Sequence, residues 1–245
     1  MAKIIALWGP PRSTGTAFEW MMRQRGDMKC FHEPFGHAWH QGESPLWPRF
    51  NRGDPSIKGL TATSVMNALA LQSKNAALFI KDSPHHCGHD WSPNSVNLFT
   101  HTFLIRNPAK TLMSLYRTTP DVNELEIGVP EHRTLFETVM ASTGQVPFVM
   151  DANDMLDDPE PMISKWCDHV GISFDQTALN WPRAAHSDTL WRTDRTYHET
   201  LTASDGLAHQ ACDRGDLNDL PDHMKAIYLR IKPHYDYLHT YRIRM

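Results

Sequence analysis

The sequence has few cysteines and no long apolar run. Its 245 residues include only four cysteines, none of them in a CxxC pair. Scattered thiols of this kind are typical of a reduced cytosolic protein and argue against a disulfide framework. A membrane-spanning helix needs about 20 mostly apolar residues in a row. No signal peptide and no apolar run of that length is visible, so we expect a cytoplasmic protein without a membrane segment.

The sequence also has no excess of positive charge and no spaced set of metal ligands. Lysine and arginine number 24 against 28 for aspartate and glutamate, which gives a net charge of −4. Such a chain has no general attraction to nucleic acid or to an anionic membrane. Among the 15 histidines, His85, His86 and His89 come nearest to a metal motif, with Cys87 as the one thiol nearby. We expect no metal site and no nucleic-acid partner.

A third absence concerns the first loop of the chain. The phosphate-binding loop of nucleoside triphosphatases has four residues between two glycines, followed by Lys-Ser/Thr. Here five residues separate Gly9 from Gly15, and Thr16 follows. This spacing disfavours ATP or GTP as the ligand. Two interpretations remain, namely a site for another phosphate-like group or an ordinary strand-turn-helix corner.

What this first stretch does contain favours an anion site. Residues 3–8 form an apolar run that stops at Gly-Pro-Pro, which predicts a buried strand and a sharp turn. Arg12 and several small or hydroxyl-bearing residues follow, and then Phe18, Met21 and Met22 recur at helical spacing. The first amide groups of a helix lack internal partners, and the helix dipole favours negative charge there. We therefore expect a phosphate-like group at this helix start.

Apolar runs and helical patterns alternate along the rest of the chain. Further strands are expected at residues 28–31, 76–80, 101–105 and 147–150, and further helices at 57–73, from 108 onward, and at 130–142, 159–170 and 221–231. This alternation predicts one domain, residues 1–245, built as a three-layer α/β/α sandwich around a mostly parallel sheet. The loop expected at residues 36–56 carries Trp39, Trp47 and Phe50, which either line an acceptor pocket or pack locally. Few regular elements are expected from 175 to 219.

Charged side chains follow two of the expected strands. Lys81 follows the strand at 76–80 and precedes His85 and His86, and Arg106 follows the strand at 101–105. Ser114 lies two helical turns beyond Arg106, within reach of the same anion. Ligands of open α/β sheets gather beyond the carboxyl ends of the strands. The alternative is that Arg106 pairs with a carboxylate and Ser114 is merely exposed.

Three segments resemble the sulfotransferases that use 3′-phosphoadenosine 5′-phosphosulfate (PAPS). Residues 11–16 (PRSTGT) are similar to the family's 5′-phosphosulfate loop, usually Pro-Lys/Arg-Ser-Gly-Thr-Thr, with one residue more between Arg12 and Gly15. Residues 103–114 resemble its 3′-phosphate motif, in which a strand-end Arg is followed eight residues later by a helical Ser. Residues 149–172 are similar to the strand, acidic residue and helix that follow in bacterial members.

The resemblance implies a P-loop-like fold and a role for each matching residue. Arg106 and Ser114 would bind the 3′-phosphate, while Lys81 and Arg12 would stabilise the leaving group. The basic C-terminal loop that many members use on the 3′-phosphate is not recognisable, and Arg192 or Arg195 would replace it. The 5′-phosphosulfate would be bound by Arg12, Ser13, Thr14, Gly15, Thr16 and Ala17.

The resemblance also implies a proton acceptor beyond Lys81. The family's base is a histidine just after the strand-end lysine, and both His85 and His86 qualify here. Histidine suits the task because its unperturbed pKa is near neutrality. Glu33 lies in a His-Glu-Pro-Phe segment that resembles a bacterial branch of the family, and it is the reserve base or a carboxylate that binds the acceptor. His85, His86 and Glu33 all remain candidates for the base.

The predicted reaction is transfer of a sulfuryl group from PAPS to a hydroxyl or amine of a small-molecule acceptor, which releases 3′,5′-ADP. Like phosphoryl transfer, it depends on positioning and charge stabilisation. The rival interpretations are a nucleotide kinase or NTPase and a non-catalytic nucleotide-binding module. A kinase needs a loop lysine and acidic Mg²⁺ ligands, and Asp151 is the only well-placed strand-end acid that the sequence indicates.

Overall fold

Five parallel strands form the centre of the part of the chain that the computed structural model describes. The described residues are 4–46, 55–88, 91–182, 199–209 and 217–245. The strands are β1 (Ile4–Trp8), β2 (Lys29–His32), β3 (Leu78–Asp82), β4 (Phe99–Ile105) and β5 (Phe148–Asp151). Their order is β2-β3-β1-β4-β5, and every neighbouring pair is parallel. Because β1 is central, the loop that follows it opens at the middle of the sheet's carboxyl edge.

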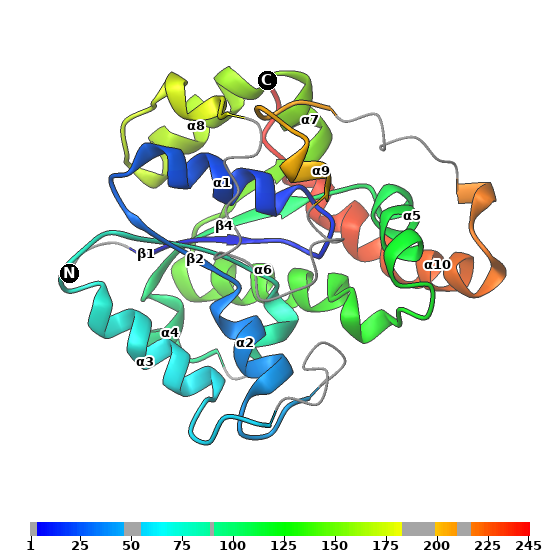
Figure 1. Ribbon diagram of the computed structural model, residues 1–245, viewed down its shortest axis with the longest axis horizontal. Helices are drawn as coiled ribbons and strands as arrows, with labels where there is room; N and C mark the ends of the chain where they lie inside the picture. The colour runs from blue at the N-terminus through cyan, green and yellow to red at the C-terminus, as the bar shows by residue number, and fades with distance from the viewer. Residues whose placement is uncertain (1–3, 47–54, 89–90, 183–198, 210–216) are drawn as a thin grey trace.

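Helices cover both faces of this sheet. On one face lie α1 (Gly15–Arg25) and α8 (Pro159–Val170; Figure 1), and Ile5 and Leu7 of β1 pack with residues of these helices. The alternate residues of β1 pack on the other face with α3 (Ala62–Gln72) and α6 (Val129–Thr143). Side chains of a strand alternate between its faces, so a strand buried on both sides reads as a continuous apolar run. The predicted three-layer α/β/α sandwich with a parallel sheet is confirmed.

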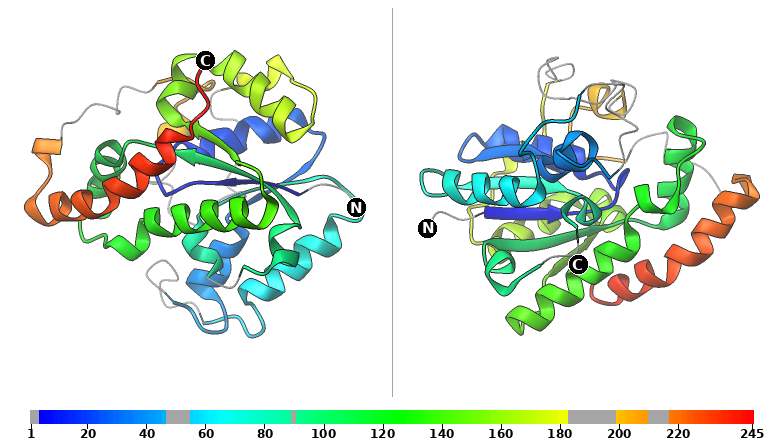
Figure 2. Two further views of the ribbon diagram at one scale, coloured as in Figure 1. Left: turned by 180° about the vertical axis from the view of Figure 1, so that it is seen from behind. Right: turned by 90° about the horizontal axis from the view of Figure 1, so that it is seen from below.

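A third apolar cluster lies between two helices beyond the sheet. It joins α5 (Pro108–Thr118) to α10 (Asp222–Thr240), and α10 then continues along α6 (Figure 2). The remaining elements are α2 (Pro34–Gln41), α4 (Pro93–Val96), α7 (Ala152–Asp157), α9 (Glu199–Thr202), and the 3₁₀ turns η2 (Pro84–Cys87), η3 (Glu124–Glu126), η4 (Gln176–Leu179) and η7 (Leu217–Asp219). None of the helices in the described ranges is long and apolar enough to cross a bilayer.

Three expected elements differ from the structure. Residues 36–41 belong to α2 and not to a loop, because the buried carboxylate of Asp82 accepts the backbone N–H of Phe35 and fixes the start of this helix. The helix expected from residue 57 begins at Ala62, where Thr61 and Ser64 form a capping box. The last helix continues past Pro233 to Thr240.

Candidate active site

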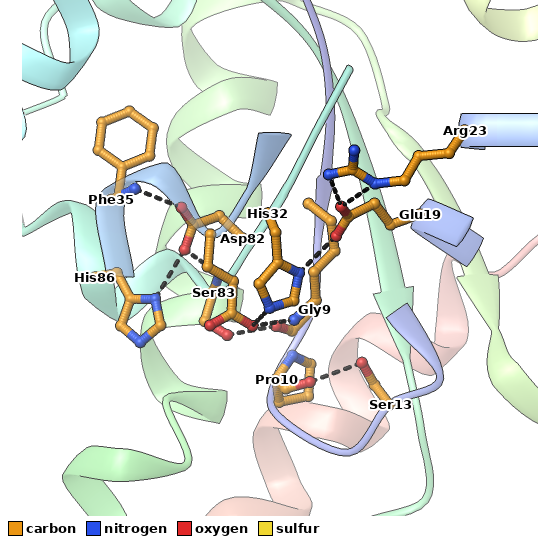
Figure 3. Close-up of polar contacts among 12 residues, drawn as sticks. Gly9, Pro10, Ser13, Glu19, Arg23, His32, Phe35, Asp82, Ser83 and His86 are labelled. Carbon is orange, nitrogen blue, oxygen red and sulfur yellow. Dashed lines mark hydrogen bonds and ion pairs between the residues drawn. The ribbon is translucent and has the colours of Figure 1, made fainter. Parts of the chain in front are cut away.

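The loop between β1 and α1 is held at the carboxyl edge of the sheet. The backbone N–H of Gly9 donates to the carbonyl of Asp82 (3.1 Å), and the hydroxyl of Ser83 donates to the carbonyl of Gly9 (2.9 Å). The hydroxyl of Ser13 donates to the carbonyl of Pro10 (2.7 Å; Figure 3). Arg12 and Thr14 both adopt left-handed backbone conformations, with φ of 61° and 74°. Such conformations are uncommon for residues other than glycine. Here they occur in the loop that has one residue more than the common family pattern between Arg12 and Gly15.

The two predicted anion-binding segments meet directly. Nε of Arg12 donates to the hydroxyl of Ser114 on α5 (2.9 Å), and Nη1 of Arg106 donates to the carbonyl of Arg12 (2.6 Å). Arg106 is buried. Two arginines from adjacent strand ends therefore lie side by side at the start of α1, where the dipole of that helix also favours negative charge.

Lys81 extends from β3 across the start of α1. A Cβ atom built on Gly15 would lie 2.8 Å from Cε of Lys81, so glycine gives the lysine its path. Nζ of Lys81 contacts Oε1 of Glu33, which itself has a left-handed backbone with φ of 43°. Burial opposes charge on both groups, but their mutual attraction lowers the pKa of Glu33 well below its usual range and raises the pKa of Lys81. The pair is thus held ionised.

His86 and Asp82 form a second polar pair. Nδ1 of His86 lies 2.7 Å from Oδ1 of Asp82, and the Asp82 carboxylate also accepts the backbone N–H groups of Phe35 (2.7 Å) and Ser83 (2.8 Å; Figure 3). Burial lowers the pKa of His86 to about 3. Burial, with the charge of Glu33, raises the pKa of Asp82 to about 7. The 2.7 Å contact thus joins a pocket histidine to a buried acid at the end of β3.

His85 has different surroundings. Its ring lies edge-on to Trp39, with centroids 5.3 Å apart, and 4.2 Å from the ring of His86. A Cβ atom on Gly128 would come within 2.0 Å of Nδ1 of His85, so this nitrogen faces the backbone of the turn before α6. Among the described residues, that buried nitrogen has no hydrogen-bond partner. Burial lowers the pKa of His85 well below its usual range.

One pocket of about 220 Å³ is lined by both arginines, Lys81, Glu33 and the two histidines, whereas Asp82 does not line it. Its lining includes every site residue predicted from the sequence, namely Arg12, Ser13, Thr14, Gly15, Thr16, Ala17, Glu33, Lys81, His85, His86, Arg106 and Ser114. Trp39 lines it as well, from α2. Trp47, Phe50, His89, Arg192 and Arg195 lie outside the described residues. The structure brings the predicted residues together, while the role of each stays a prediction.

The sequence analysis missed two features of this pocket. Asp82 was not singled out, although it is the last residue of β3 and is fully buried, so Asp151 is not the only strand-end acid. The sequence feature that could have identified Asp82 is its spacing of four residues from His86, with Pro84 between them. The second feature is a wall made by Leu201, Ser204 and Leu207. Its sequence has no periodic pattern, and it is placed by a backbone bond from Leu207 to the carbonyl of Leu179 (3.1 Å).

A buried carboxylate supports the rim of the pocket next to β2. Glu19 of α1 is fully buried, accepts from Nη2 of Arg23 (2.6 Å), and lies 2.6 Å from Nδ1 of His32 (Figure 3). His32 in turn lines the pocket beside Glu33. No group of three or more metal-ligating side chains occurs within the described ranges.

Comparison with known proteins gives matches of three kinds. A family model described as "Sulfotransferase domain" matches residues 2–233. Two Arabidopsis thaliana proteins, branched-chain-amino-acid aminotransferase-like proteins 2 and 1, are 24% identical over 207 residues and 25% identical over 194 residues. These matches cover 84% and 73% of this chain but 36% and 32% of the relatives. The chain thus spans about a third of the length of the curated relatives it matches.

Two solved structures share the fold at low sequence identity. The sulfotransferase domain of the Synechococcus PCC 7002 olefin synthase has a TM-score of 0.54 and 16% identity, covering 96% of this chain and 95% of that domain. A mouse sulfotransferase complexed with PAP has a TM-score of 0.53 and 13% identity, covering 98% and 90%. Since the family model matches almost the whole chain and the fold agrees, this protein belongs to the sulfotransferase family.

Proposed function

We propose that this protein transfers a sulfuryl group from PAPS to a hydroxyl or amine of a small-molecule acceptor. One observation carries the proposal beyond family membership. Arg12, Arg106 and Lys81, from three different strand ends, converge on a single pocket. A pocket with three cations at a helix start is suited to a ligand with more than one anionic group.

The residues present fit a donor that carries a phosphosulfate at one end and a phosphate at the other. The loop from Arg12 to Ala17, which leads into α1, would hold the 5′-phosphosulfate, and Arg106 with Ser114 would hold the 3′-phosphate. When bound, PAPS supplies a sulfuryl group attached to a phosphate that can leave as 3′,5′-ADP, also called PAP. The mouse sulfotransferase of similar fold is itself a PAP complex.

The chain's own groups would then lower the barrier by placement and charge. Lys81 and Arg12 offset the negative charge that gathers on the departing phosphate. A buried histidine, His85 or His86, accepts the proton of the acceptor. Glu33 keeps Lys81 charged, because a carboxylate in contact with an ammonium group stabilises its protonated form.

The acceptor would enter beside α2. Trp39 and His40 of that helix line the pocket next to both candidate bases. Flat apolar surface with polar edges suits a small molecule that has one reactive hydroxyl or amine. The contribution of Arg192 or Arg195 to the 3′-phosphate, the single-domain organisation and the cytoplasmic location stay predictions.

A comparison of two nucleotides tests the proposal. We expect 3′,5′-ADP to raise the melting temperature and ATP with Mg²⁺ to have little effect. Ligand at about 100 times its Kd stabilises a folded protein by about 2.7 kcal/mol. Stabilisation by ATP with Mg²⁺ alone would favour a kinase or NTPase. Incubation with PAPS and a panel of hydroxyl and amine compounds, followed by mass spectrometry, should reveal the gain of one SO₃ group. Binding without any such product would favour a non-catalytic module.

A further inference from the structure

Asp82 is placed so that it can fix the orientation of one pocket histidine. It ends β3 with its side chain fully buried, and its carboxylate contacts three groups from separate places in the chain. These are the backbone N–H of Phe35 at the start of α2, the backbone N–H of Ser83, and Nδ1 of His86 in η2 (Figure 3). The Asp82 carboxylate therefore connects the end of β3, the start of α2 and the ring of His86.

The backbone N–H groups of Phe35 and Ser83 determine which partner donates in the contact between Asp82 and His86. A backbone N–H can only donate, so both bonds favour the ionised, accepting form of Asp82. An ionised carboxylate has no hydrogen to give, and the 2.7 Å contact then requires Nδ1 of His86 to carry the proton. The neutral ring consequently has its lone pair on Nε2. Within the described residues no hydrogen bond is seen at Nε2, and the ring lines the pocket.

The ring of His86 is also fixed by its packing. A Cβ atom on Gly36 would lie 2.9 Å from its Nδ1, so glycine in α2 allows the ring to lie against that helix. Trp39 and His40 contact the ring with centroid distances of 5.9 and 5.4 Å. His85 lacks an equivalent carboxylate, because its Nδ1 faces the backbone at Gly128. Only one of the two candidate bases is thus oriented by an acid.

We propose that Asp82 is a positioning residue that holds His86 with the proton on Nδ1, so that Nε2 of His86 accepts the proton of the acceptor. This inference rests on the proposed sulfuryl transfer. As the acceptor oxygen or nitrogen bonds to sulfur, its proton moves to Nε2. The S–O bond to the 5′-phosphate breaks, and its electron pair leaves with 3′,5′-ADP. The charge on the imidazolium ring is balanced by the Asp82 carboxylate.

The groups around the pair define its pH dependence. Glu33, Lys81, His32, His40, His85 and Cys87 face Asp82 or His86. Burial and the charge of Glu33 raise the pKa of Asp82 to about 7. At lower pH the carboxyl group takes up a proton and donates it to Nδ1, which moves the ring hydrogen to Nε2 and removes the base. We expect kcat/KM to fall as pH decreases through about 7.

Asp82→Asn tests the inference against His86→Gln and a matched control. An amide offers one oxygen where the carboxylate offers two, so Asp82→Asn turns its NH₂ group toward at least one N–H donor and removes the charge that balances the imidazolium ring. We expect Asp82→Asn to lower kcat by at least about 100-fold, the scale of general-base catalysis, with unchanged affinity for 3′,5′-ADP. The Asp82→Asn/His86→Gln double variant should have a kcat no lower than that of His86→Gln alone.

The matched control is Asp151→Asn. Asp151 is likewise a buried strand-end acid that accepts hydrogen bonds from a backbone N–H and from Tyr235, yet it does not line the pocket. Its kcat should be unchanged.

NMR of the ¹⁵N-histidine-labelled wild type measures the tautomer without any substrate or variant. At pH 8 we expect His86 protonated at Nδ1, and protonation at Nε2 would overturn the inference. It would also be overturned if Asp82→Asn kept the wild-type kcat, or if His85→Gln lost more kcat than His86→Gln. Failure of the proposed function is a distinct result, namely no 3′,5′-ADP binding and no sulfuryl transfer by the wild type. The NMR spectrum would then still decide whether Asp82 sets the tautomer.

Discussion

Arg106 joins two segments that are far apart in the chain, because its guanidinium group donates to the backbone of Arg12 in the opposite loop. Replacing it with alanine should weaken the binding of 3′,5′-ADP. Loss of a hydrogen bond to a charged group costs about 1.5–3 kcal/mol, and isothermal titration calorimetry would measure the change in Kd.

Arg133→Ala is the matched control for this experiment. Arg133 is an arginine of α6 that pairs with Glu137 and lies over the ring of Tyr237, and it does not line the pocket. Its loss should leave the affinity for 3′,5′-ADP at the wild-type value. If Arg106→Ala behaved in the same way, the assignment of the 3′-phosphate site would be wrong.

Glu33 illustrates how a neighbour changes the interpretation of a residue. From the sequence it is a reserve base or an acceptor-binding carboxylate, but in the structure it contacts the ammonium group of Lys81. This contact lowers its pKa, although burial alone would raise it. A carboxylate with a lowered pKa is a poor proton acceptor near neutral pH. The contact therefore favours His85 or His86 over Glu33 as the base.

At the scale of elements, the start of α1 and the end of β3 depend on each other through Gly15. A Cβ atom there would lie 2.8 Å from Cε of Lys81, the far part of a flexible side chain that can move away. Gly15→Ala should therefore fold with near wild-type stability, while displacement of Lys81 lowers kcat by about tenfold or more. Steady-state kinetics would measure kcat, and urea unfolding would measure the stability.

Gly144→Ala should give the opposite pattern. Gly144 ends α6 with φ of 67°, lies away from the pocket, and has open space within 4 Å of the point where a Cβ atom would be added. The left-handed backbone costs an alanine about 1 kcal/mol, so stability should fall while kcat is retained. A Gly15→Ala variant that lost stability but kept full kcat would contradict the proposed role of Lys81.

At the scale of the whole molecule, two buried histidines hold the core around Trp8. Nε1 of Trp8 donates to Nδ1 of His101 (2.8 Å), and Nε2 of His132 lies 3.0 Å from the carbonyl of Trp8. Burial lowers the pKa of both histidines to about 4. Between pH 6.5 and 4 the unfolded chain binds protons that the folded chain does not, so stability is lost as pH falls through this window.

We expect acidification from pH 7 to pH 5 to cost about 2 kcal/mol for each of these two histidines. The contributions of Asp82 and His86 oppose each other, because the folded state raises the pKa of Asp82 to about 7 and lowers that of His86 to about 3. Urea unfolding at the two pH values measures the loss. His132→Gln keeps a donor for the Trp8 carbonyl but does not titrate, so the loss should be smaller in this variant. Equal stability at both pH values in the wild type would contradict the expectation.

Most of the fold was predictable because β1, β3 and β5 are buried along their whole length and β4 nearly so. The apolar runs at β1, β3 and β4 appear directly in the sequence, and the helical spacing of Phe18, Met21 and Met22 correctly indicated α1. The start of α2 was not predictable, because its first N–H is satisfied by Asp82, a residue 47 positions away. Local patterns carry no information about a partner so distant in the chain.

The sequence by itself determined the alternation of the main strands and helices, the loop before α1, and the spacing of Arg106 and Ser114, because each depends on residues close together in the chain. Only the tertiary structure decided which side chains meet. Parallel pairing places the carboxyl ends of β1, β3 and β4 at one edge, where Arg12, Lys81 and Arg106 become neighbours. The same pairing leaves Asp82 buried beneath the pocket, where its charge and hydrogen bonds act on His86 and not on His85.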